Sequence, residues 1–205
     1  MQIHKIYPYG FGANTYAITA DGKTAVVIDP SSKHVESKLL ALGLDVKYVL
    51  LTHCHFDHVG GAGVLQQSGA KVLCLDKEKP LIGTKADLFE EFGVPRTPYF
   101  VSETLSDGQE IELCGLKIKA IATGGHTAGS ACYIFEDDGG RYLFSGDTLF
   151  KNTIGRTDLP TSNIGEIRES LKKLCALEDM PIYAGHGEES TLQEERKNNP
   201  FLQDL

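Results

Sequence analysis

The chain has 205 residues, of which 41% are hydrophobic and 23% charged, and 28 acidic against 20 basic side chains give a formal net charge of −8. This composition is that of an ordinary folded protein, so it argues against disorder, collagen-like repeats and coiled coils, and the length favours one domain. The negative charge argues against a nucleic-acid-binding surface. Because no apolar run is long enough to span a membrane and none follows basic residues at the N-terminus, we expect a cytoplasmic protein.

The first third of the sequence predicts strands that alternate with helices. A glycine-containing turn at 20–23 separates two short segments rich in β-branched residues, which is typical of a hairpin. The predicted elements are strands at 3–7, 15–19, 24–28, 47–51 and 71–75 and helices at 33–42 and 59–68. This order indicates an α/β fold.

The segment from 76 to 107 has the least periodicity in the chain. Pro80, Pro95 and Pro98 interrupt it, and only the piece at 86–92 has a helical pattern. Long segments without regular structure are often functional in compact domains. We therefore interpret 76–107 as an insertion near the active site that could act as a lid, within a single domain spanning 1–205.

The remainder of the sequence again predicts strands followed by helices. Turns containing glycine separate short strand-like segments, and apolar residues then recur at helical spacing. The predicted elements are strands at 110–113, 116–122, 130–135, 142–145 and 181–184 and helices at 162–174 and 188–197.

A dense cluster of metal-binding residue types follows the predicted strand 47–51. His53 and His55 alternate along an extended loop and so project to one side, whereas Asp57 and His58 come at the turn into a helix and can serve a neighbouring position. Imidazole and carboxylate are ligands that zinc and other borderline metals accept. A solvated loop would not need three of the seven histidines of the chain within six residues.

Three further candidate ligands each follow a predicted strand and are directly preceded by glycine: His126, Asp147 and His186. Loops at strand ends carry ligands to one edge of a sheet, and glycine lets the backbone approach closely. Each residue is a weak signal alone. Together with the first cluster they predict a metal site.

The sequence resembles the metallo-β-lactamase superfamily, and the resemblance covers essentially the whole chain. The signature HxHxDH of that superfamily stands here as His53-Cys54-His55-Phe56-Asp57-His58, followed by His126, Asp147 and His186 in the expected order. Within the superfamily the chain is most similar to the short glyoxalase II-like hydrolases, through Gly125-His126-Thr127, Ser145-Gly146-Asp147-Thr148-Leu149-Phe150 and Gly155-Arg156-Thr157-Asp158-Leu159-Pro160.

The resemblance implies a four-layer αββα sandwich with a two-metal centre at one edge. It assigns His53, His55 and His126 to one site and Asp57, His58 and His186 to the other, with Asp147 as the bridge. The two divalent ions would be zinc, or alternatively iron or manganese, roughly 3.5–4 Å apart.

The implied activity is hydrolysis of a hydroxyacyl thioester such as S-lactoylglutathione by a hydroxide shared between the two ions. The ions lower the pKa of that water from about 15.7 toward about 7, and Asp57 would orient the hydroxide as well as bind metal. A thiolate leaves without much help from a general acid, and the motifs offer none. The alternatives are a persulfide (sulfur) dioxygenase that uses one iron in the first site and a hydrolase of another ester or a lactone.

Three more residues are candidates for supporting roles. Asp29 ends a predicted strand and could accept a ring N–H from a ligand histidine, or could be a turn residue. Lys151 and Arg156 follow Asp147 and could hold an anionic substrate tail, or could be solvated surface charges. The expected partner is a small-molecule thioester. The sequence ends at Leu205, too early for the helical region with which glyoxalase II binds glutathione, so the identity of the thiol in the substrate is left open.

Overall fold

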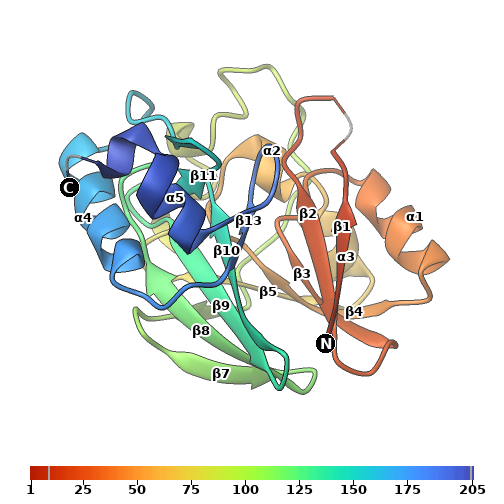
Figure 1. Cartoon of the computed structure of the whole chain (residues 1–205). Coiled ribbons are helices and arrows are strands. Elements are labelled where there is room, and N and C mark those ends of the chain that lie inside the picture. The colour runs from red at the N-terminus through yellow and green to blue at the C-terminus, as the bar shows by residue number, and fades with distance from the viewer. Residues whose placement is uncertain (9, 204) are drawn as a thin grey trace.

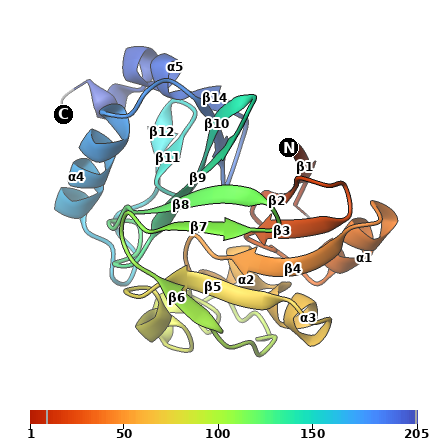
Figure 2. The ribbon, with the colours of Figure 1, turned by 90° about the horizontal axis from the view of Figure 1, so that it is seen from below.

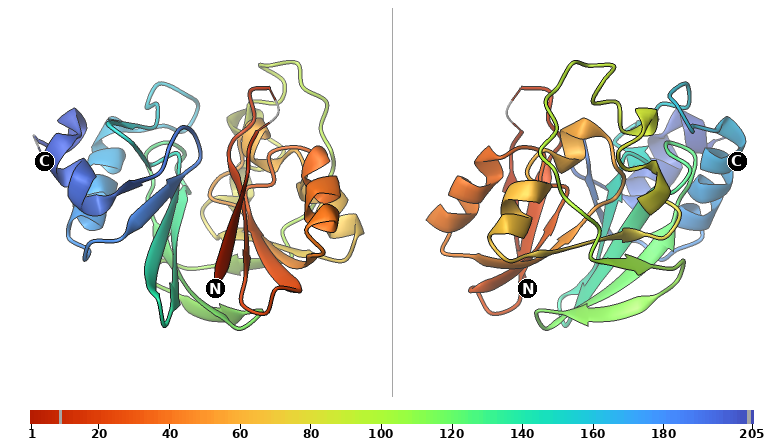
Figure 3. Two further views of the ribbon diagram at one scale, coloured as in Figure 1. Left: turned by 45° about the vertical axis from the view of Figure 1, so that its right-hand side comes forward. Right: turned by 180° about the vertical axis from the view of Figure 1, so that it is seen from behind.

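The structure, a computed structural model, describes residues 1–8, 10–203 and 205. Two six-stranded sheets lie face to face, and helices cover the outer side of each (Figures 1 and 3). The prediction of an αββα sandwich is confirmed. In the part of the chain that the structure describes, no helix has the length and apolar character needed to cross a membrane.

The first sheet comes from the first half of the chain and has the order β1-β2-β3-β4-β5-β6. Its strands are β1 (Gln2–Ile6), β2 (Thr15–Thr19), β3 (Thr24–Ile28), β4 (Asp45–Leu50), β5 (Lys71–Leu75) and β6 (Glu103–Leu105). Strands β1 to β3 pair antiparallel, and β3 to β6 pair parallel. Helix α1 (His34–Ala41) connects β3 to β4, helices α2 (Phe56–Val59) and α3 (Ala62–Gln67) connect β4 to β5, and a segment with two 3₁₀ turns connects β5 to β6. Near-continuous burial of β2, β3 and β5 agrees with a sheet that is covered on both faces.

The second sheet has the order β14-β13-β10-β9-β8-β7. Its strands are β7 (Glu110–Leu113), β8 (Leu116–Ala122), β9 (Ala131–Asp137), β10 (Gly140–Gly146), β13 (Pro181–Ala184) and β14 (Ser190–Thr191). The helices α4 (Ile164–Cys175) and α5 (Leu192–Asn198) cover its outer face, and the short pair β11 (Leu149–Phe150) and β12 (Thr153–Ile154) lies beside it (Figure 2). Strand β9 is antiparallel to β8 and β10, and β13 is parallel to β10, so β8, β10 and β13 run in the same direction.

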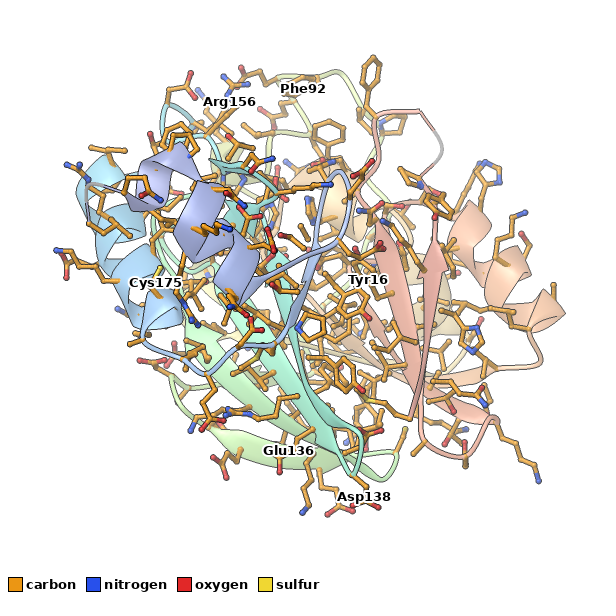
Figure 4. All side chains as sticks on the ribbon, viewed as in Figure 1. Tyr16, Phe92, Glu136, Asp138, Arg156 and Cys175 are labelled. Atoms are coloured by element: carbon orange, nitrogen blue, oxygen red, sulfur yellow. The ribbon has the colours of Figure 1, made fainter. Side chains whose placement is uncertain are left out.

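Three apolar clusters fill the three interfaces between the four layers. Strand β2 shows how the alternation of side chains along a strand builds them: Tyr16 and Ile18 face the second sheet, whereas Ala17 faces the outer helices. Between the sheets, the ring of Tyr16 packs edge-on against Phe144 with ring centroids 5.3 Å apart. Figure 4 shows Tyr16 in the middle of the molecule.

Two buried tyrosine hydroxyls join the sheets directly. Tyr16 of β2 donates to the carbonyl of Ala184 at 2.8 Å, and Tyr133 of β9 donates to the carbonyl of Leu51 at 2.8 Å. Both carbonyls stand one or two residues before a predicted ligand loop. The hydrogen bonds between the sheets therefore also fix where those loops begin.

Twelve of the fifteen predicted elements agree with the structure to within two residues at each end, and the other three, all helices, need correction. In place of the helix at 59–68 there are two short helices, because the Gly61 N–H donates to the Pro30 carbonyl at 2.7 Å and the Asp57 carbonyl accepts from the Ala13 N–H at 3.0 Å, so the two do not bond to each other. The last helix begins at Leu192 rather than at 188, since β14 precedes it and the Thr191 hydroxyl caps it.

The prediction of a helix at 86–92 is wrong. A 3₁₀ turn over Lys85–Asp87 ends at Leu88, whose φ of +64° cannot continue a helix. The Asp87 carboxylate accepts hydrogen bonds from the backbone of Gly83 and Phe89 and pairs with Arg96, which holds this local structure instead. The end of the segment 76–107 forms β6, which pairs with β5 at the sheet edge (Figure 2).

We expect Tyr133→Phe to lower the free energy of unfolding by about 1–3 kcal/mol, because it leaves the Leu51 carbonyl without its buried donor. The measurement is urea denaturation followed by circular dichroism. Tyr142→Phe, on the neighbouring strand β10, is the matched control and should change stability by less than about 0.5 kcal/mol. Equal effects in the two variants would contradict the role given to the Tyr133 hydroxyl.

Candidate metal centre

The seven predicted ligands meet at one end of the sandwich, shown at the top of Figure 1, where α2 lies between the two halves. Strands β8, β10 and β13 run in the same direction, so their carboxyl ends reach the same edge. The ligands follow β4 (His53 and His55), lie in α2 (Asp57 and His58), or follow β8 (His126), β10 (Asp147) and β13 (His186).

The side chains form two groups of ligand atoms. In the first, ligand atoms of His53, His55 and His126 lie within 4.8 Å of one another, and in the second those of Asp57, His58 and His186 do so. The tightest contacts are 3.0 Å between His126 Nε2 and His55 Nδ1 and 3.1 Å between His186 Nε2 and Asp57 Oδ2. The two groups have the composition that the family resemblance implies.

Asp147 lies between the two groups and touches both. Its Oδ2 is 3.5 Å from His126 Nε2 in the first group and 3.6 Å from His186 Nε2 in the second. Its Oδ1 is 3.2 Å from His58 Nε2. A carboxylate in this position can contribute one ligand atom to each group.

Several atoms that face this space are buried and lack a hydrogen-bond partner. Among the described residues, Nε2 of His53, His55 and His58 and Oδ1 of Asp147 are in this state. Buried polar atoms are nearly always hydrogen-bonded, so a cluster of exceptions indicates missing ions. Their chemistry, imidazole nitrogen and carboxylate oxygen, fits divalent metals.

The charge balance of the cluster supports the same conclusion. Burial lowers the pKa of His53, and it lowers that of His55 to about 3, so both rings are neutral and can offer a lone pair. His58 behaves oppositely: burial would lower its pKa, but the carboxylates of Asp147, Asp57 and Asp29 together raise it well above the usual value. Three carboxylates around one buried ring leave the centre short of positive charge, which metal ions would supply.

Asp29 fixes the orientation of two ligand histidines. Its Oδ2 accepts from His58 Nδ1 at 2.8 Å and from the Thr52 hydroxyl at 2.6 Å, and its Oδ1 accepts from the Thr52 backbone N–H at 2.8 Å. Since the Thr52 hydroxyl gives its proton to Asp29, its oxygen accepts from His53 Nδ1, 3.0 Å away. Both rings therefore keep a proton on Nδ1 and turn Nε2 to the centre, where it would be the atom that binds a metal ion.

The main chain of Arg156 orients a third histidine, His126, whose Nδ1 donates to the Arg156 carbonyl at 3.0 Å. The guanidinium, predicted to hold an anionic substrate, is exposed and pairs with both oxygens of Asp158 at 2.9 and 3.0 Å. Lys151, predicted for the same role, pairs with Glu188 at 2.5 Å and does not line the cavity described below.

Glu78 was missed by the sequence analysis. Its side chain is fully buried, and it accepts from the Cys54 backbone N–H at 2.7 Å and from the Thr127 hydroxyl at 2.8 Å. It thereby ties the loop of His53 and His55 to the loop of His126. In the sequence it stands in the charged run 76–79, which has the pattern of a solvated turn, so no local signal marks it.

The glycine before His186, Gly185, lies against the side chains of two other ligands, which leaves no room for a side chain there. A Cβ at Gly185 would overlap Asp147 Oδ1 and press on the His58 ring. A Cβ at Gly155 would likewise overlap the Asp147 carbonyl. These two positions need the smallest side chain because the ligand loops pack directly on them.

The two groups open into a cavity of about 600 Å³. His55, Asp57, His126, Asp147 and His186 form its floor. The other lining residues are Phe11, Phe56, Leu88, Phe92, Val94, Phe150, Thr153, Ile154, Arg156 and Leu159. Substrate can therefore reach the ligand groups from solvent.

Comparison with known proteins agrees with this architecture. Residues 8–186 match the family described as the metallo-beta-lactamase superfamily. Hydroxyacylglutathione hydrolase GloC of Haemophilus influenzae is 33% identical over 210 residues, which cover 98% of each chain. A probable metallo-hydrolase of Methanocaldococcus jannaschii is 31% identical over 91% of this chain and 93% of its own.

Solved structures with the same fold cover nearly the whole chain. The BLEG-1 B3 metallo-beta-lactamase has a TM-score of 0.89 and 28% identity, over 98% of this chain and 99% of its own. TTHA1623 in a di-iron-bound form has a TM-score of 0.81 and 32% identity over 96% and 100%. ETHE1 from Myxococcus xanthus has a TM-score of 0.76 and 26% identity over 98% and 84%.

We expect Asp29→Asn to weaken metal binding about 10- to 100-fold, because an amide cannot accept all three of the hydrogen bonds that Asp29 accepts. Zinc affinity would be measured by competition with a chelating dye. Asp138→Asn is the control: Figure 4 shows Asp138 at the opposite end of the molecule from Arg156. If the Asp29→Asn protein binds zinc as tightly as the unchanged protein, Asp29 does not position the ligand histidines.

We expect Glu78→Gln to lower the free energy of unfolding by about 1–3 kcal/mol, because the amide keeps one acceptor oxygen and so cannot accept from both Cys54 and Thr127. Metal affinity should fall as well, since the link between the two ligand loops is broken on one side. Thermal unfolding and metal titration test the two effects. Glu112→Gln, exposed on β7, should change neither.

Proposed function

The chain belongs to the metallo-β-lactamase superfamily, and we propose that it is a metal-dependent hydrolase of hydroxyacyl thioesters, the class that includes S-lactoylglutathione. The observation that carries the proposal is the presence of two ligand groups with Asp147 between them. Hydrolysis by a pair of ions needs both groups. Similarity to hydroxyacylglutathione hydrolase GloC supports the choice of substrate class.

Two divalent ions bound there would supply an activated water and polarise the substrate carbonyl. The metals would be zinc, and iron is a realistic alternative because the similar TTHA1623 structure is di-iron-bound. Asp57 lines the cavity, so its carboxylate can orient the attacking water and take up its proton. His186 lies on the cavity side of the same group and holds Asp57 in place at 3.1 Å.

The cavity suits a substrate whose leaving group needs no proton in the transition state. Among the described lining residues, Arg156 has the only titratable side chain outside the ligand set. It is paired with Asp158 and stays protonated, so it cannot act as a general acid. An amine leaving group requires a general acid, whereas a thiolate does not. This chemistry favours a thioester over an amide.

A second candidate function is a mononuclear-iron persulfide dioxygenase. One observation favours it: His53, His55 and His126 form a complete three-histidine group by themselves. The dioxygenase would leave Asp57, His58 and His186 without a catalytic role. Hydrolysis of another ester or of a lactone would use both groups and remains a variant of the main proposal.

We expect removal of metal by a chelator to abolish release of thiol from S-lactoylglutathione and to lower the melting temperature, because the ions bind only the folded chain. Addition of zinc, manganese or ferrous iron should restore both. The same metal-analysed sample would be given a persulfide while oxygen uptake is followed. Oxygen consumption without thioester cleavage would show that the protein is a dioxygenase and that the proposed hydrolase function is wrong.

We expect Asp57→Ala to lower kcat by about 100-fold or more at saturating metal, because the carboxylate that accepts the proton of the water is lost. Metal content would be measured in the same sample, which separates catalysis from metal loss. Asp138→Ala, far from the centre, is the control. Full turnover of a metal-loaded Asp57→Ala protein would exclude the role assigned to Asp57.

A further inference from the structure

The walls of the cavity above the metal centre are mainly aromatic and aliphatic. One wall comes from the first half of the chain and the other from the loops after β10. The apolar side chains of the two walls are Phe11, Phe56, Leu88, Phe92 and Val94 on one side and Phe150, Ile154 and Leu159 on the other. A thioester carbonyl placed over the ligand groups would send a substituent toward each wall.

Two aromatic side chains at the rim are exposed to an unusual degree. Phe11 is 94% exposed and Phe92 is 53% exposed, although large apolar residues are normally buried. Isolated exposed residues need no explanation, but several around one cavity mark a binding surface. Figure 4 shows Phe92 at the same end of the molecule as Arg156, and both residues line the cavity.

The apolar surface begins directly beside the ligands. Phe56 stands between His55 and Asp57 in the sequence, and its ring packs against that of Phe92 with centroids 4.9 Å apart. On the other side, the ring of Phe150 lies 6.1 Å from that of His186. A substituent near the reacting carbonyl therefore meets rings rather than polar groups.

Among the described residues, the one cation that lines the cavity is already paired with a carboxylate. Among the described lining residues, Arg156 is the only arginine or lysine, and its Nε and Nη2 donate to the two oxygens of Asp158 at 2.9 and 3.0 Å. Lys151, on the neighbouring turn, is paired with Glu188. The formal net charge of −8 adds a general repulsion of anions.

We infer that the cavity selects thioesters whose thiol half is uncharged and apolar, aliphatic or aromatic, in preference to thioesters of glutathione, which carries two carboxylates. This inference rests on the proposed thioester hydrolysis and names its substrate class. In the reaction, water adds its oxygen to the acyl carbon and the carbon–sulfur bond breaks. The products are a carboxylate, a thiol that takes one proton of the water, and one proton that is released to solvent, so no oxidant or reductant is needed.

The test compares two thioesters that share the lactoyl group and differ in the thiol: S-lactoylglutathione and the lactoyl thioester of benzyl thiol. Both thiols are alkyl thiols, so the leaving groups are similar. With metal-loaded protein we expect kcat/KM to be roughly tenfold higher for the benzyl thioester, with most of the difference in KM. Added salt should not raise KM for S-lactoylglutathione, because no free cation attracts it.

Variants locate the preference in the cavity. Phe92→Ala and Phe11→Ala should each lower the ratio of the two kcat/KM values at least threefold. Leu40→Ala removes an exposed apolar side chain from α1, on the outer side of the first sheet, and should leave the ratio unchanged. Asp158→Asn frees Arg156 and should lower KM for S-lactoylglutathione severalfold without improving the benzyl thioester.

The outcomes separate this inference from the proposed function. If metal-loaded protein cleaves S-lactoylglutathione as efficiently as the benzyl thioester or better, the inference is wrong and the hydrolase stands. If Phe92→Ala and Phe11→Ala leave the ratio unchanged, the apolar rim does not select the substrate and the inference is also wrong. If neither thioester is cleaved, the proposed function fails, and the inference fails with it.

Discussion

The structure depends above all on the concentration of buried negative charge at one end of the sandwich. Asp29, Asp57 and Asp147 surround His58, and Glu78 lies nearby beneath two of the ligand loops. Buried carboxylates are strongly unfavourable unless hydrogen bonds or cations compensate them. Here backbone N–H groups, threonine hydroxyls and histidine rings compensate part of the carboxylate charge. Metal ions bound between the two ligand groups would compensate the remaining charge. Folding and metal binding are therefore parts of one electrostatic balance.

The two sheets bring these charges together through parallel strand directions and buried links. Strands β8, β10 and β13 end at the same edge, and β4 of the other sheet meets them there. The hydroxyls of Tyr16 and Tyr133 bridge the sheets just before the loops that carry ligands. A change in how the sheets pack would thus displace ligands on both sides at once. This arrangement makes the apolar core a determinant of the geometry of the polar centre.

The sequence was informative wherever the signal was local. Short segments of strand-forming residues separated by glycine-containing turns predicted most strands, and the spacing of His53, His55, Asp57 and His58 predicted a metal site. Features set by distant contacts were not predictable. The role of Arg156 lies in its carbonyl, which carries no residue-specific signal, and Glu78 is buried only because chain segments far apart in sequence close over it. The helix predicted at 86–92 fails for a local reason, since Asp87 binds the nearby Gly83, Phe89 and Arg96 and so holds a different structure.

The aromatic rim consists of side chains that are largely free of the hydrogen bonds supporting the centre. Phe11 and Phe92 stand on separate loops, whereas the ligand loops are tied to Asp29, Glu78 and the Arg156 carbonyl. Substitutions at the rim would therefore place little strain on the ligands. A lineage could exchange one acyl or thiol preference for another while its metal chemistry stays intact, so this fold can diversify at the entrance without rebuilding its interior.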